Sequence, residues 1–254
     1  MRSLGFRGFR LDFAFGYSGA VAKNYVEKAL EVRDVDGALV GDFVVAECWG
    51  SLDYDKATGL MQRNQDAHRQ RIVDWIDAAG GMCAAYDFTL KGILQEAMEK
   101  CQYWRLVDDQ GRAPGVAGLW PSRAVTWCDN HDTGRAPNQN HWPFPADKVW
   151  QGYAYILTHP GMPCLNWTDV LADKDGTLSK LVDIRRRARV RADAKLEVLC
   201  ASDAIYVAQI TGLESRLLVK LGPQWDMGDA APDGRSWEVA LSGEDWCVWR
   251  ERAL

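Results

Sequence analysis

Two hydrophobic patterns alternate along the chain up to about residue 193. Short runs of aliphatic and aromatic residues, typical of buried strands, are followed by longer stretches whose apolar residues recur every three or four positions, as on one face of a helix. The predicted strands cover 7–12, 43–49, 84–87, 124–132 and 162–166, and the predicted helices cover 18–33, 65–79, 89–100, 146–158 and 178–191. Five strand-helix units in succession predict an α/β fold with a parallel sheet.

The first predicted helix begins at Ser18, whose hydroxyl is a suitable N-terminal cap. Its apolar positions predict one face that packs on the sheet, formed by Val21, Ala22, Tyr25, Val26, Ala29 and Leu30. The helix therefore marks the first covering layer of the predicted sheet.

The pattern changes to strict alternation from about Lys195 onward. Apolar residues alternate with polar ones between Gly, Pro, Asp and Ser turn signals, which is typical of short antiparallel strands. We therefore predict two parts, an α/β part over 1–193 and a small antiparallel β-sheet domain over 194–254.

Several of the predicted strands end in acidic groups. Asp12 and Glu47 close the first two strands, and the run Asp129–Asp132 closes the fourth. In a parallel β/α barrel the active site lies at the carboxyl ends of the strands, so these groups are expected on one rim. A closed barrel needs eight strands, and five units predict either a partial barrel or an open sheet.

The rim carboxylates suit glycoside hydrolysis, in which one carboxyl group attacks the sugar and a second protonates the leaving oxygen. Arg10 lies two residues before Asp12 and points to the same face of the strand, so a structural ion pair is an open alternative. The wide spacing of Asp12, Glu47 and Asp132 along the chain favours a shared site. Trp49, two residues after Glu47, offers a flat face for a sugar ring.

Composition and charge narrow the class of partner. The 254 residues are 47% hydrophobic and 26% charged, as in ordinary soluble globular proteins, and the net charge of −5 gives no reason to expect a nucleic-acid partner. The arginine cluster over 185–191 is interpreted as a solvated helix face. No apolar run is long enough to span a membrane, so no membrane partner is expected.

Seven cysteines without a C-x-x-C spacing predict free thiols rather than a disulfide framework or a zinc site. Such usage suggests a reducing compartment, cytoplasm or plastid. No signal or transit peptide precedes the first strand, and a start so close to that strand suggests that upstream sequence is missing, so the localisation stays unknown. Twelve tryptophans add weight to a carbohydrate ligand, because indole rings stack on sugars.

Three motifs carry a resemblance to a known family. They are Gly8-Phe9-Arg10-Leu11-Asp12, Ala46-Glu47-Cys48-Trp49 and Trp127-Cys128-Asp129-Asn130-His131-Asp132-Thr133-Gly134. They resemble three conserved regions of the alpha-amylase family of glycoside hydrolases, most closely the plant and green-algal type. The resemblance continues through 64–70, 142–145 and 151–161 and covers essentially the whole chain.

The resemblance implies strands four to eight of a TIM (β/α)8 barrel followed by the small sheet domain. It makes Asp12 the nucleophile, Glu47 the general acid and base, and Asp132 the third carboxylate. Arg10 would keep Asp12 ionised, and His131 would donate to sugar hydroxyls. The implied activity is retaining endo-hydrolysis of alpha-1,4-glucosidic bonds in starch, glycogen and maltooligosaccharides, by a protein expected to be a monomer when complete.

The departures from the family pattern matter as well. The family's first conserved region, its first three strands and the insertion that carries most calcium ligands have no counterpart here. The resemblance implies calcium as a cofactor, with the backbone carbonyl of Gly16 as one ligand. Trp120 matches half of a paired-tryptophan starch site whose other half is Leu119, and 165–168 replaces a more aromatic segment.

Two alternatives stay open. One is a truncated, catalytically inactive chain that binds alpha-glucan through its aromatic residues, because a five-strand sheet leaves the strand of Asp12 at an edge. The other is a metal-dependent hydrolase that uses Asp129, His131 and Asp132. It is the weaker one, because four histidines at unrelated spacings offer no repeated pair of ligands.

Overall fold

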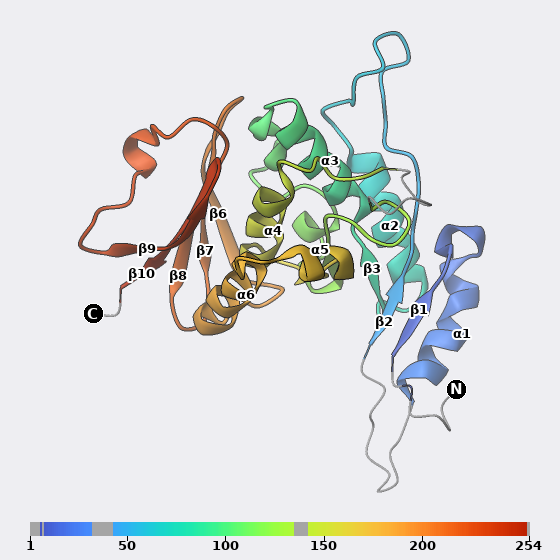
Figure 1. The fold of residues 1–254 in the computed structure, drawn as a ribbon. Coiled ribbons are helices and arrows are strands. Elements are labelled where there is room, and N and C mark those ends of the chain that lie inside the picture. The colour runs from blue at the N-terminus through green and yellow to red at the C-terminus, as the bar shows by residue number, and fades with distance from the viewer. Residues whose placement is uncertain (1–5, 7, 32–42, 135–141, 253–254) are drawn as a thin grey trace, which may run out of the picture.

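The protein is described from a computed structural model, which covers residues 6, 8–31, 43–134 and 142–252. Its first sheet has five parallel strands that lie side by side in chain order (Figure 1). These strands are β1 (Phe9–Leu11), β2 (Val44–Ala46), β3 (Ala84–Tyr86), β4 (Ala124–Thr126) and β5 (Met162–Pro163). The predicted strand-helix units and their parallel sheet are therefore confirmed.

Helices follow the strands and cover one face of the sheet. They are α1 (Gly19–Leu30), α2 (Asp66–Ala78), α3 (Phe88–Glu99), α4 (Val149–Thr158), α5 (Trp167–Ala172) and α6 (Thr177–Ala188), with the short 3₁₀ helices η2 (Ala14–Gly16), η3 (Tyr103–Leu106), η4 (Val116–Gly118) and η5 (Pro121–Arg123) between the elements of this part; one more, η6 (Gly228–Ala230), belongs to the C-terminal sheet. Val44, Ala46 and Ala85 pack into the main core with these helices, whereas Val45 and Ala84 point to the other face. The sheet thus has two faces with different neighbours, as a barrel wall does.

The strand register places the strand ends level with one another. Leu11 lies beside Ala46, and Ala46 lies beside Ala85. The amide of Glu47 donates to the carbonyl of Leu11 at 2.9 Å, which continues the pairing one residue beyond β2. The residues that follow β1, β2 and β3 therefore emerge on one rim.

The prediction for α1 is right about its cap and partly wrong about its buried face. The hydroxyl of Ser18 accepts from the amide of Val21 at 3.3 Å, as expected. Ala22, Val26 and Ala29 are buried, but Val21 and Tyr25 are 56% and 67% exposed. Val21 and Tyr25 lie beyond the reach of α2 and the sheet, because β1 is an edge strand. The predicted end of this helix at Arg33 lies outside the described residues.

The other element boundaries agree within a few residues, with two informative differences. Asp87 was predicted to end a strand, but it is the N-terminal cap of α3, where its carboxylate accepts from the amides of Leu90 and Ala117 at 2.9 Å. Burial raises the pKa of Asp87 to about 6, against those two hydrogen bonds. Helix α5 was not predicted, since six residues are too few to show a helical period.

The arginine cluster is not wholly a solvated helix face. Arg185 donates from α6 to the carbonyls of Leu157, His159 and Gly161 at distances between 2.7 and 3.2 Å. The rest of the cluster is exposed, as expected. The interpretation was therefore wrong for Arg185, which closes the C-terminal end of α4.

The second sheet is antiparallel, with the strand order β6-β7-β8-β10-β9. Its strands are β6 (Lys195–Ala201), β7 (Tyr206–Thr211), β8 (Arg216–Leu221), β9 (Trp237–Gly243) and β10 (Trp246–Glu251). The sheet lies on the side of α4 and α6 away from β1 (Figure 1). The predicted alternation of apolar and polar residues therefore identified this sheet, and β6 begins next to the proposed boundary at 193/194.

Aromatic stacking, a hydrogen bond and an ion pair join α4 to the second sheet. The ring of Tyr155 stacks on His159 with centroids 3.8 Å apart, and the Nε2 atom of His159 lies 3.0 Å from the hydroxyl of Tyr206 in β7. On the same side, Lys148 Nζ is 2.9 Å from Asp245 Oδ2. The complete burial of His159 lowers its pKa to about 3, so its imidazole is neutral in the folded protein.

All seven cysteines are free thiols, as predicted. Cys48, Cys83, Cys128 and Cys247 are buried, and burial raises the pKa of these four thiols above its ordinary value. Across the described ranges, no helix combines the length and the apolar character that crossing a bilayer requires.

Candidate active site

Arg10 joins the two carboxylates that the sequence placed at the ends of β1 and β2. Its Nη1 atom lies 2.5 Å from Asp12 Oδ1, and its Nη2 atom donates to Glu47 Oε1. Burial lowers the pKa of Arg10, but the ion pairs with Glu47 and Asp12 outweigh it and leave this pKa above its usual value. A guanidinium that is always charged thus lies between two carboxylates.

Glu47 is the buried member of this group, and Asp12 is the exposed one. The side chain of Glu47 is 7% exposed, whereas that of Asp12 is 74% exposed. The second oxygen of Glu47 accepts from the amide of Phe13 at 3.1 Å. Phe13 has φ 45° and ψ 50°, a left-handed conformation that is unusual for an aromatic residue and that turns its amide toward Glu47. Strain at this position is typical of functional sites.

The loop after β4 carries the predicted site residues His131 and Asp132. Its anchor is Asp129, which is 3% exposed and accepts from Thr133 Oγ1 at 2.9 Å and from the amide of Phe144 at 3.1 Å. Asp132 and His131 lie at the outer side of the loop, with His131 Nε2 3.2 Å from Asp132 Oδ2. Asp129 therefore supports the loop, while Asp132 and His131 face solvent at 30% and 58% exposure.

A buried lysine beneath this loop was not singled out from the sequence. Lys91 of α3 is fully buried and donates to the carbonyl of Trp142 at 2.7 Å and to Gln95, with its ammonium 3.8 Å from the centre of the Trp142 ring. Burial lowers the pKa of Lys91 to about 7, although the charge of Asp129 acts in the opposite direction. Lys91 thus fastens the segment that follows the loop to α3.

A groove of about 340 Å³ separates the loop after β4 from the segment after β5. Its lining residues are Tyr86, Asp129, Asn130, His131, Gly134, Cys164, Leu165, Asn166, Trp167 and Thr168. Tyr86, the last residue of β3, lines one end of the groove. The sequence had not singled out Tyr86 or Trp167, although both occupy strand-end positions where site residues gather.

The two predicted sugar-stacking tryptophans have different surroundings. Trp49 is partly buried and stacks on Phe88, with ring centroids 5.1 Å apart at 30°, so one face of the indole is covered by protein. Trp120 directly precedes η5 and lies near Gly81, at the end of the strands opposite the rim. Trp49 belongs to the neighbourhood of Glu47, whereas Trp120 does not.

The residues that the structure describes do not assemble a calcium site around Gly16. Gly16 ends η2, and the Phe13 ring lies so close that a Cβ atom at Gly16 would be 2.5 Å from it. No three His, Cys, Asp or Glu side chains of the described segments come together as a metal site. Among the described residues, therefore, no such group of three surrounds Gly16, and Asp129, His131 and Asp132 do not form one either.

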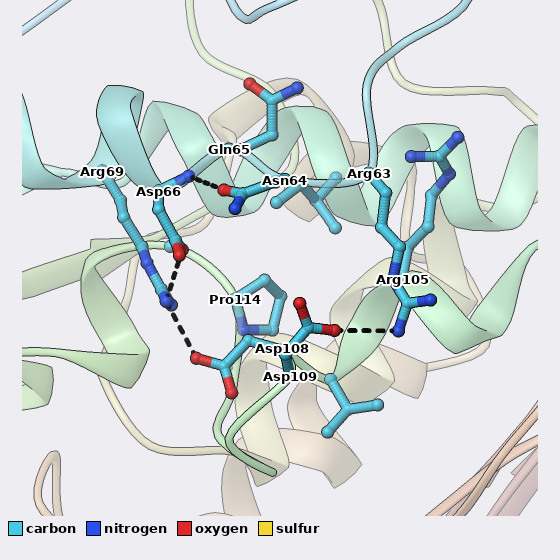
Figure 2. Close-up of a pocket in the computed structure, with 12 residues that line it drawn as sticks. Arg63, Asn64, Gln65, Asp66, Arg69, Arg105, Asp108, Asp109 and Pro114 are labelled. Atoms are coloured by element: carbon cyan, nitrogen blue, oxygen red, sulfur yellow. Dashed lines mark hydrogen bonds and ion pairs between the residues drawn. The ribbon is translucent and has the colours of Figure 1, made fainter.

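A second, smaller pocket lies between α2 and the segment after η3 (Figure 2). Its volume is about 40 Å³, and ion pairs account for most of its charges. Arg69, only 3% exposed, reaches Asp66 at 2.6 Å and Asp108 at 2.8 Å, and Arg63 reaches Asp109 at 3.1 Å. Because its charged side chains mostly pair with one another, this pocket is a structural ion-pair network.

The parallel strand-helix units, with charged groups at the carboxyl rim and a separate antiparallel sheet, define a protein of the β/α-barrel class. Residues 187–250 match the family model of the alpha-amylase C-terminal beta-sheet domain. The alpha-amylase type B isozyme of Hordeum vulgare is 42% identical over 161 residues, which are 63% of this chain and 99% of that relative. The chain belongs to the alpha-amylase family.

Two longer relatives match nearly the whole chain. Probable alpha-amylase 2 of Arabidopsis thaliana is 48% identical over 98% of this chain, and alpha-amylase 3, chloroplastic, of the same plant is 42% identical over 98%. The chain spans 56% of the first relative and 26% of the second. It therefore corresponds to about half, or about a quarter, of these curated proteins.

Solved structures with low sequence identity share the fold. The gamma-CGTase from alkalophilic Bacillus clarkii has a TM-score of 0.65 at 15% identity, over 99% of this chain and 41% of that chain. The alpha-amylase from Geobacillus thermoleovorans, complexed with acarbose, has a TM-score of 0.62 at 14% identity, over 98% of this chain and 60% of that chain. These structures confirm the barrel-wall architecture with its C-terminal sheet.

Proposed function

We propose that this chain carries the reacting carboxylates of an alpha-amylase that hydrolyses alpha-1,4-glucosidic bonds in starch, glycogen and maltooligosaccharides with retention of configuration. The observation that carries the proposal is the guanidinium of Arg10 between Asp12 and Glu47. The family membership and the names of the plant relatives support alpha-glucan as the substrate.

The Arg10 bridge is compatible with the retaining mechanism that the family resemblance implies. Two carboxyl groups bound to the two terminal nitrogens of one guanidinium are held close together. Retaining glycosidases need a separation of about 5–5.5 Å, whereas inverting enzymes need about 6.5–9.5 Å to admit a water molecule between the groups and the sugar.

The proposed roles are those that the family resemblance implies, and the surroundings of each group are compatible with them. Asp12, the exposed carboxylate beside a permanent positive charge, attacks the anomeric carbon, and Glu47 gives a proton to the leaving oxygen. Glu47 then takes a proton from the water that hydrolyses the glycosyl ester on Asp12. The ion pair of Glu47 with Arg10 corresponds to this base form. Asp132 and His131 are proposed to bind hydroxyls of the reacting sugar.

A second candidate function is binding of alpha-glucan without hydrolysis. The observation that favours it is the 74% exposure of Asp12 on the edge strand β1, since an active site works best when water is excluded. Here the aromatic residues of the rim and groove would hold the glucan. The two candidates are distinguished by incubating the purified chain with a blocked maltooligosaccharide that carries a chromophore. Only an enzyme releases the chromophore.

The main test is an assay on soluble starch with the longest natural polypeptide that contains this sequence. We expect Asp12→Asn and Glu47→Gln each to lower kcat by at least about a thousandfold, because each removes a reacting group. A matched control is Asp109→Asn, an exposed carboxylate in the other pocket. Unchanged turnover in the first two variants contradicts the proposal. This assay does not test the predicted calcium cofactor or the predicted location in the plastid or cytoplasm.

A further inference from the structure

Helix α5 presents a strongly exposed tryptophan at the carboxyl rim. Trp167 is the first residue of α5, and it is 70% exposed. It lines the groove opposite Asn130 and His131. A single exposed indole is common on protein surfaces, but this one lines a groove at the rim, where a ligand can cover it.

The backbone beneath Trp167 is firmly tied to the loop that carries Asp132. Asn166 caps α5 by accepting from the amide of Thr168 at 2.8 Å, and its Nδ2 atom is 3.4 Å from the carbonyl of Asn130. The amide of Asn166 also donates to the hydroxyl of Tyr153 at 3.1 Å. The exposed ring is therefore mounted on an anchored turn, which pre-organises it for binding.

The position of Trp167 relative to Glu47 sets the kind of ligand. Glu47 follows β2 and Trp167 follows β5, three strands along the sheet order. Neighbouring strands lie about 4.8 Å apart, so about 14 Å separates the two strand ends. Only a substrate of several linked sugars reaches from one to the other. Tyr86, at the end of β3, lies in the groove between them.

We propose that Trp167 is a substrate-binding residue that stacks on a glucosyl unit of an alpha-glucan, several units away from the bond that is cleaved. The inference rests on the proposed function of the same rim. A flat indole face suits the C–H face of a sugar ring, and the polar groups of Asn130 and His131 across the groove suit its hydroxyls. Trp167 thereby favours long chains over short ones.

Leu171 offers a matched control on the same helix. It is 68% exposed, almost as open as Trp167, but it does not line the groove. Trp167→Ala and Leu171→Ala both remove exposed apolar surface. Only Trp167→Ala removes an aromatic ring that could stack on a sugar in the groove.

The experiment measures binding and turnover of maltoheptaose and maltotriose by the longest natural polypeptide that contains this sequence. Binding is followed by calorimetry in the Glu47→Gln background, which separates affinity from hydrolysis. We expect Trp167→Ala to weaken maltoheptaose binding about tenfold and to raise KM similarly, with little change in kcat or in maltotriose binding. Trp167→Phe is expected to retain most of the affinity, and Leu171→Ala to bind as the parent does.

The outcomes distinguish this inference from the function on which it rests. Unchanged maltoheptaose binding in Trp167→Ala, when the parent binds, overturns the inference and leaves the proposed function standing. An equal loss in Leu171→Ala overturns it as well, because stacking would then not be the cause. Absence of both binding and hydrolysis in the parent chain overturns the proposed function and the inference together.

Discussion

The guanidinium of Arg10 at the end of β1 binds the carboxylate of Glu47 beyond the end of β2. Glu47 is almost completely buried, and a buried carboxylate is costly unless it is paired. The same guanidinium holds Asp12, so one cation orients both groups that the proposed chemistry needs. Loss of Arg10 is therefore expected to disturb the positions of both carboxylates and so to lower the proposed activity.

Replacing Arg10 by Gln is expected to lower kcat/KM on maltooligosaccharides by at least about a hundredfold, because the two carboxylates lose the charge that orients them. Arg10→Lys keeps the positive charge, but an ammonium lacks the two planar NH2 groups that bind both carboxylates. Its activity should therefore lie between that of the parent and that of Arg10→Gln. Arg63→Gln serves as the control, since Arg63 is 64% exposed and outside the rim. Activity retained in Arg10→Gln would remove Arg10 from the proposed machinery.

The loop that carries Asp132 is predicted to depend on Asp129. Asp129→Ala leaves Thr133, the amide of Phe144 and the buried charge of Lys91 without their acceptor or counter-charge. We expect a loss of about 2–4 kcal/mol in the free energy of unfolding, measured by urea denaturation. The exposed Asp109→Ala should change it by no more than about 0.5 kcal/mol. Equal effects of the two substitutions would contradict this role.

Two neighbouring arginines of α6 are expected to differ sharply. Arg185→Leu removes three hydrogen bonds to backbone carbonyls at the end of α4 and should destabilise the protein by about 2–4 kcal/mol. Arg187→Leu, at an exposed position of the same helix, should cost no more than about 0.5 kcal/mol. Thermal unfolding of both variants under one condition tests the contrast, and similar melting temperatures would refute it.

His159 is predicted to make the protein sensitive to acid. Its pKa is about 3 when folded and about 6.5 when unfolded, so between these values the unfolded chain binds more protons and stability falls as the pH is lowered. From pH 7 to pH 5 this contributes a loss of about 2 kcal/mol. His159→Gln should lose less stability over that interval. Parallel pH profiles of the two proteins in urea unfolding would show that His159 does not act in this way.

Much of the fold was predictable because its signals are local. Buried strands and amphipathic helices each repeat within a few residues, so the order of the elements and the change to an antiparallel sheet near Lys195 follow from the pattern. The rim was predictable for a similar reason. Asp12 and Glu47 end hydrophobic runs, and parallel strands bring such ends together. The chemical roles of these residues came from the resemblance.

The remaining features depend on contacts between distant segments. Val21 and Tyr25 have a helical period, but their exposure depends on β1 being at the edge of the sheet. Lys91 looks like a surface lysine in sequence, and only the fold shows it under the Trp142 ring. The short helix α5 and its exposed Trp167 produce no period at all, so no sequence pattern could reveal them.

The most direct test of the central claim is the anomeric configuration of the first product, followed by proton NMR during cleavage of maltoheptaose by the longest natural polypeptide that contains this sequence. If Asp12 attacks and Glu47 protonates, as proposed for the pair that Arg10 holds, the alpha anomer of the product forms first and later equilibrates with the beta anomer. The same signal should vanish in Glu47→Gln. Initial formation of the beta anomer, or undiminished product in that variant, would contradict the account.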